Sequence, residues 1–124
     1  MQPARRGVSQ GGQSETGTSA YSLIRQAILD RNQIVAVYGG HLREVCPHIV
    51  GMKNGRAHAL FYQFGGTSNS GLSPIGSPDN WRCVLVEKLT EVSVRPGPWY
   101  TAAEPPRQQN CVDVIDVTIV PLAI

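Results

Sequence analysis

The sequence predicts a mainly β domain in which one α-helix precedes about five strands that form a small β-barrel. Apolar residues recur at helical spacing once, just after residue 18, and from residue 33 onward the spacing falls to two. Gly-Gly and Asn-Gly pairs separate the short apolar runs, as they do in β-hairpins. We expect the strands to close into a barrel, because closure removes exposed sheet edges.

Length and composition indicate one domain. A chain of 124 residues with 41% hydrophobic and 16% charged residues has enough apolar surface for a single core. We place this domain at residues 19–124. Residues 1–18 are rich in Gly, Ser and Gln, and we expect a flexible tail there. The net charge of +2 is too small to indicate a nucleic-acid binder by itself.

The cysteines and the N-terminus favour a cytoplasmic protein. The three cysteines, at positions 46, 83 and 111, leave one unpaired and form no close pair with metal-ligand spacing, which fits a reducing cytosol. No apolar stretch follows Arg5 and Arg6, so a signal peptide is not predicted. No apolar run has the length of a membrane span, and we expect no membrane partner.

The helix and the first two hairpins have recognisable boundaries. Apolar residues at 21, 24, 27 and 28 lie on one helical face, with Ser19 as the predicted N-cap and Asn32 near the end. A first strand at 33–38 ends at Gly39-Gly40. A second strand at 42–52 contains Pro47, which predicts an edge position or a bulge because proline has no N–H to donate. Asn54-Gly55 is a strong hairpin signal.

The remaining strands are separated by irregular segments. The third strand, 57–64, places His58, Leu60, Tyr62 and Phe64 on one face and Ala59, Phe61 and Gln63 on the other. Residues 65–80 form a long polar loop before a fourth strand at 81–86, and an apolar series then continues to Pro96. The proline-rich stretch after it is irregular, and we expect Trp99 and Tyr100 to hold it to the body. A final strand at 111–120 changes its apolar phase after Val114, which indicates a bulge or burial on both faces.

Residues 21–95 resemble the WYL domain. The resemblance lies in a strand ending at Tyr38, in Arg43-x-Val45-x-Pro47, in the hairpin at Asn54-Gly55, and in Arg82-x3-Val86-x-Lys88-Leu89-x2-Val92. It implies an SH3-like (Sm-like) β-barrel and a ligand-sensing role of the kind found in bacterial transcription regulators, with single-stranded nucleic acid among the ligands. The namesake Trp-Tyr-Leu falls on His58-Ala59-Leu60, Lys88 replaces the usual second Arg, and one helix leaves no room for a helix-turn-helix. The chain therefore resembles a divergent, stand-alone sensor domain.

The predicted ligand-binding residues combine basic and aromatic side chains. Arginine suits phosphate or carboxylate groups, and Arg43 and Arg82 match the family motif; the alternative is pairing with Glu44, Glu87 or Glu91. Aromatic rings can stack on bases, and the alternative for them is a place in the core. The full predicted set is Tyr38, Arg43, His48, Tyr62, Gln63, Trp81 and Arg82.

No reaction is predicted. His41, Cys46 and His48 lie close together, but the paired spacing of structural zinc sites is missing, and no motif supports a cysteine nucleophile. We expect no cofactor, no metal and no enzymatic activity. The predicted function is a ligand-sensing or regulatory domain that binds a nucleotide or single-stranded nucleic acid. The alternative is a protein-interaction module of a multi-protein bacterial system, and homo-oligomerisation remains open.

Overall fold

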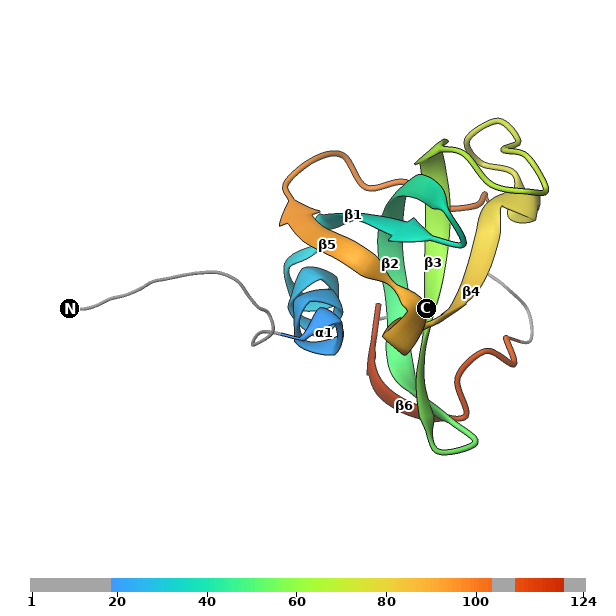
Figure 1. Ribbon diagram of the computed structural model, residues 1–124. Helices are drawn as coiled ribbons and strands as arrows, with labels where there is room; N and C mark the ends of the chain where they lie inside the picture. The colour runs from blue at the N-terminus through green and yellow to red at the C-terminus, as the bar shows by residue number, and fades with distance from the viewer. Residues whose placement is uncertain (1–18, 104–108, 120–124) are drawn as a thin grey trace.

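The computed structural model describes residues 19–103 and 109–119 and shows one helix packed against a curved antiparallel sheet (Figure 1). The predicted tail at 1–18 lies outside the described residues. The elements are α1 (Ala20–Asp30), β1 (Gln33–Tyr38), β2 (His41–Lys53), β3 (Arg56–Gly66), the 3-10 turn η1 (Pro78–Asn80), β4 (Trp81–Leu85), the 3-10 turn η2 (Val86–Lys88), β5 (Thr90–Arg95) and β6 (Val114–Thr118).

The sheet has six strands and is not closed. Its order is β4-β3-β2-β1-β5, and β6 pairs with β2. Two strands pair with the same edge of the long strand β2. Its first half pairs with β1, and its second half, from Ile49 to Met52, pairs with β6. β4 and β5 do not pair, and the backbone N–H of Leu85 donates to the Tyr38 hydroxyl. The mainly β class is therefore confirmed, whereas the predicted five-stranded barrel is not.

Local sequence signals account for α1 and the hairpins. The Ser19 hydroxyl caps α1 by accepting from the Ser22 N–H at 3.1 Å, as predicted. Gly39-Gly40 and Asn54-Gly55 all have positive φ, which two-residue hairpin turns require. The register of β2 against β3 shifts between Pro47 and Ile49, so the bulge expected at the proline is confirmed.

The two faces of the sheet carry different clusters. The inner face, covered by α1, holds the main aliphatic core, in which Ile24 and Ile28 pack with Phe61 and other residues. The outer face carries a smaller cluster of Ile49, Leu60, Cys111 and Val112, against which Trp81 packs. Adjacent residues of β3 enter opposite clusters, which confirms the predicted alternation.

A connection from β5 to β6, which we call the strap, crosses the outer face. We define it as the described residues 96–103 and 109–113. Trp99 and Tyr100 hold it to the body, as predicted, through ring contacts with His48 and Phe64. Because Cys111 and Val112 turn into the outer cluster, the last strand begins only at Val114, three residues later than predicted. The register of β6 shifts near its centre, which confirms a bulge.

A disulfide joins Cys83 of β4 to Cys111 of the strap, while Cys46 is free and buried. The pairing was not predicted, because the two cysteines lie 28 residues apart with no local motif. Disulfides persist mainly in oxidising compartments. The cysteine pattern thus no longer favours a reducing cytosol. Within the part of the chain that the structure describes, no helix has the length and apolar character needed to cross a bilayer.

Candidate ligand-binding site

Four of the seven predicted site residues meet at one end of the inner face, beyond the aliphatic core. They are Tyr38, Arg43, Gln63 and Arg82, each two residues along its strand from a buried core residue. The Gln63 side-chain oxygen accepts from Arg43 Nη1 at 3.2 Å and from Arg82 Nε at 3.0 Å. Two guanidinium groups therefore share one neutral amide oxygen.

Gln63 is fixed in the orientation that presents this oxygen. Its side chain is fully buried, and its amide nitrogen donates to the carbonyls of Gly65 and Thr67 at 2.9 and 3.0 Å. An amide nitrogen cannot accept a hydrogen bond, so a flipped amide would lose all four contacts. Gln63 thus acts as a positioning residue for both arginines.

No carboxylate neutralises the arginine pair among the described residues. Of the glutamates named as alternative partners, Glu44 pairs with Arg95 at 3.0 Å and Glu87 pairs with Arg56 at 2.7 Å, and no ion pair within the described residues joins Glu91 to either arginine. That alternative is therefore wrong for Arg43 and Arg82. Burial, together with the nearby charge of Arg82, lowers the pKa of Arg43. The site carries an excess of positive charge in a partly desolvated position.

The two arginines differ in how many N–H donors remain available for a ligand. Arg82 uses all five of its N–H donors on protein acceptors: the Gln63 oxygen, the carbonyls of Asp79, Trp81 and Gly71, and the Ser68 hydroxyl. Its bonds tie the 65–80 loop to the sheet.

Arg43 retains free donors. Its Nε and Nη2 both donate to the Tyr38 carbonyl, at 3.2 and 3.1 Å, and Nη1 donates to Gln63. The guanidinium also lies 5.4 Å from the centre of the Tyr38 ring. One N–H on each terminal nitrogen has no acceptor in the described part of the chain. Arg43 is 9% exposed, so its side chain is largely shielded from water but still reaches the surface.

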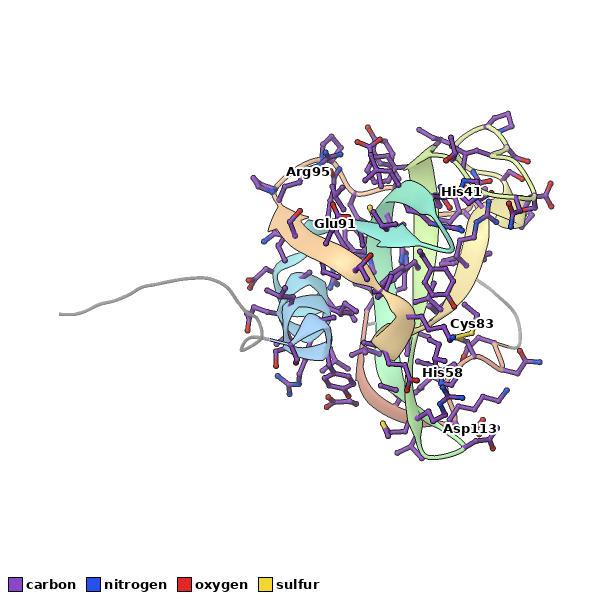
Figure 2. The ribbon with its side chains drawn as sticks, in the orientation of Figure 1. His41, His58, Cys83, Glu91, Arg95 and Asp113 are labelled. Atoms are coloured by element: carbon purple, nitrogen blue, oxygen red, sulfur yellow. A yellow bond between two sulfur atoms is a disulfide. The ribbon has the colours of Figure 1, made fainter. Side chains whose placement is uncertain are left out.

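Polar side chains of the loop surround this end of the sheet. Figure 2 shows His41 at the same end as the 65–80 loop, where its two ring nitrogens lie 2.9 Å from Thr67 Oγ1 and 2.9 Å from Asn69 Oδ1. Buried Asn80 bonds both backbone groups of Ser73, at 2.9 and 2.8 Å. The loop expected to be irregular is therefore anchored by Arg82, His41 and Asn80.

The other three predicted residues form an aromatic cluster on the outer face. The Trp81 ring lies edge-on to His48 at 4.8 Å and to Tyr62 at 5.1 Å. Tyr62 is fully buried, and its hydroxyl donates to the Ser77 carbonyl at 2.8 Å. The buried Trp81 Nε1 has no hydrogen-bond partner in the described structure. Trp99 completes the cluster through its contact with His48. No local pattern predicts this contact, because Trp99 is an aromatic residue in an irregular segment.

His48 connects the sheet to the strap. Its Nδ1 lies 2.8 Å from the Cys46 carbonyl, and its Nε2 lies 3.1 Å from Thr101 Oγ1. The neutral ring satisfies both contacts by donating to the carbonyl and accepting from the hydroxyl. Burial lowers the pKa of His48 to about 4. Among residues 19–103 and 109–119, no three potential metal ligands come together, and His41 and His48 face different partners.

Comparisons with known proteins give no family for this chain: no protein-family model matches it, and neither curated proteins nor solved structures show a significant similarity to it.

Proposed function

We propose that the protein is a non-enzymatic ligand-sensing or regulatory domain, of the kind that the WYL resemblance implies, and that it binds a nucleotide or single-stranded nucleic acid. Arg43 receives a phosphate oxygen through its two free N–H groups, and Arg82 adds positive charge while holding the loop. The supporting observation is the pair of guanidinium groups that share the Gln63 oxygen with no carboxylate within 4.0 Å among the described residues.

Two neighbouring positive charges without a counter-charge are costly in a partly desolvated position. Arginines that lie partly out of water usually pair with an acidic group, because desolvating like charges together is unfavourable. Phosphate oxygens supply both the missing charge and acceptors that match the guanidinium fork. Arg82 and the half-buried Trp81 are neighbours on the edge strand β4 and face opposite sides of it, so a single strand of nucleic acid that passes around this edge meets a charge on one face and an aromatic ring on the other.

Fluorescence anisotropy with short single-stranded DNA and RNA, at several salt concentrations, tests the proposal. We expect binding at low salt that weakens as salt rises, and a loss of about tenfold or more in Arg43→Ala. Arg56→Ala is the matched control, because it removes an exposed arginine on the same sheet away from the site. Equal affinity in wild type and Arg43→Ala would contradict the proposal.

The second candidate is a protein-interaction module without nucleic-acid binding. It is favoured by the open sheet and by the exposed apolar residues Val114 and Ile115 on β6, which are 67% and 48% exposed. A partner strand could pair along such an edge. Co-purification of a protein, with an absorbance spectrum free of nucleic acid and no oligonucleotide binding, would support this candidate over the first.

A further inference from the structure

The strap covers the aromatic cluster from two directions. Near its start, Trp99 contacts the His48 ring with centroids 5.1 Å apart and planes inclined by 35°, and Thr101 bonds the same ring. Near its end, Cys111 and Val112 pack in the outer cluster against which Trp81 lies. His48 and Trp81, two residues that we assign to the ligand, are thus both beneath the strap.

Trp99 occupies the position in which a planar ligand would stack on His48. An indole is a flat heteroaromatic ring of about the size of a nucleobase, and its plane is tilted by 35° from that of His48, closer to parallel than the plane of Trp81, which lies at 85°. The chain's own ring therefore fills this stacking position. A base can reach His48 only after Trp99 moves.

Isolated hydrogen bonds, with no strand ladder, hold the first part of the strap in place. The Tyr100 N–H donates to Cys46 Sγ at 3.2 Å, the Ala103 N–H donates to the Gly76 carbonyl at 3.0 Å, and Gln33 Nε2 donates to the Pro98 carbonyl at 2.6 Å. The covered state also leaves the Trp81 indole N–H buried without an acceptor. These bonds are separate from the strand ladders of the sheet, so the strap can open as a unit of its own while the sheet stays paired.

The disulfide links the second part of the strap covalently to the sheet. It joins the strap at Cys111 to Cys83 on the edge strand β4, two residues from Trp81. Cys83 is exposed and Cys111 is buried (Figure 2 labels Cys83). An incoming thiolate therefore has access to the Cys83 sulfur.

We propose that the Cys83–Cys111 disulfide holds the strap over the rings of His48 and Trp81, each of which can stack on a nucleobase, and that a dithiol reductant opens it. One thiolate of the reductant bonds to Cys83 Sγ, and Cys111 leaves as a thiolate that takes up a proton. The second thiol of the reductant then displaces Cys83 as a thiol, so the reductant becomes a disulfide and the protein gains two electrons and two protons. Only the identity of the ligand rests on the proposed function above.

Tryptophan fluorescence tests the opening without any ligand. The chain has two tryptophans, and both lie in this cluster. We expect dithiothreitol to raise the acrylamide quenching constant of the full chain about twofold or more, while hydrogen exchange stays slow in β1 and β2. Unchanged quenching would overturn the proposal. Faster hydrogen exchange across the whole sheet would overturn it too, because the disulfide would then stabilise the entire fold and not the strap alone.

Cysteine variants distinguish the opening of the strap from other effects of the reductant. The double variant Cys83→Ser/Cys111→Ala is expected to show the high quenching constant without dithiothreitol and no further response to it. Cys46→Ser retains the disulfide and keeps an acceptor for the Tyr100 N–H, so it is expected to respond as the wild type does, which makes it the matched control. A double variant with the low quenching constant of the oxidised chain would contradict the proposal.

Binding of a short oligothymidylate tests the link to the ligand. We expect an affinity about tenfold higher for the reduced chain than for the oxidised chain, because each added base stack contributes on that scale. A rise in the quenching constant with no oligonucleotide binding in either state would support the opening of the strap and contradict the proposed function. Binding that is equal in both states, with increased quenching, would contradict the stacking surface while leaving the Arg43 site supported.

Discussion

At the residue scale, His48 couples folding to pH. Its pKa is about 4 in the folded chain because burial disfavours the charged ring, against 6.5 for the free side chain. Between these values the unfolded chain binds a proton that the folded chain does not, so stability falls as pH falls from 6.5 to 4. The full effect is about 3 kcal/mol. Urea unfolding at a series of pH values measures it.

His48→Gln supplies the control for this prediction, because glutamine keeps a donor and an acceptor but does not titrate. The variant is expected to have lower stability at neutral pH and a weaker pH dependence above pH 5. Asp116 and Glu87 do not account for a pH dependence above pH 5, because both have a lowered pKa in the folded chain. An unchanged slope in the variant would show that another group is responsible.

The thiol of Cys46 gives a second residue-scale prediction. It is fully buried, and burial raises its pKa to about 11, so the reactive thiolate is absent at neutral pH. With the other two cysteines paired, we expect no reaction of the native chain with a thiol reagent and one reactive thiol after unfolding in denaturant without reductant. Three thiols after such unfolding would contradict the disulfide.

The functional residues show what the sequence can and cannot reveal at this scale. Arg43 and Arg82 were predicted from residue type and motif position and Gln63 was named in the same set, and period-two alternation explains why all three reach the inner face. Their convergence on one oxygen depends on strand register, which the sequence does not state. The Cys83–Cys111 pair and the contact of Trp99 with His48 join distant segments through an irregular strap, so no local pattern predicted them.

At the element scale, α1 is docked to β6 by one side-chain cluster. The Tyr21 hydroxyl donates to Asp116 Oδ2 at 2.7 Å, and Arg25 Nε donates to the same oxygen at 3.2 Å. We expect Tyr21→Phe to lower the free energy of unfolding by about 1 kcal/mol. Arg25→Ala should cost less, because its ion pair is exposed. Urea unfolding of both variants at neutral pH provides the measurement.

The same bond predicts behaviour at high pH. Burial and the bond to Asp116 raise the pKa of Tyr21 to about 12, above the usual 10. Its contribution to stability is therefore present below pH 10 and is lost as pH rises from 10 toward 12. Absorbance titration of the tyrosinates should show one late-titrating group that is missing in Tyr21→Phe. Identical titration curves would contradict the bond.

Elements defined by local chemistry were predicted well. Ser19 at the N-cap, Gly39-Gly40 and Asn54-Gly55 at the turns, and Pro47 at the bulge all act through their own backbone geometry. The predicted start of the last strand was wrong. Cys111 and Val112 are residue types that favour strands, but they pack in a tertiary cluster on the outer face. Packing overrode propensity there.

At the scale of the whole molecule, the sheet curves without closing, and its two faces carry separate parts of the candidate site. The mainly β class followed from hairpin signals, whereas closure depends on whether β4 reaches β5, and these strands do not pair. The inner face presents charge at Arg43, and the outer face presents rings beneath the strap. The edge strand β4 joins them, because it supplies both Trp81 and Arg82.

The most direct test of the central claim is nuclear magnetic resonance of the arginine side chains during titration with a thymidine dinucleotide that carries a 5′-phosphate. We predict that the Arg43 terminal N–H signals shift and exchange more slowly with water as phosphate binds, while those of Arg56, held by Glu87, stay unchanged. Binding that shifts Arg56 and leaves Arg43 unaffected, or no shift at either arginine at low salt, would contradict the account.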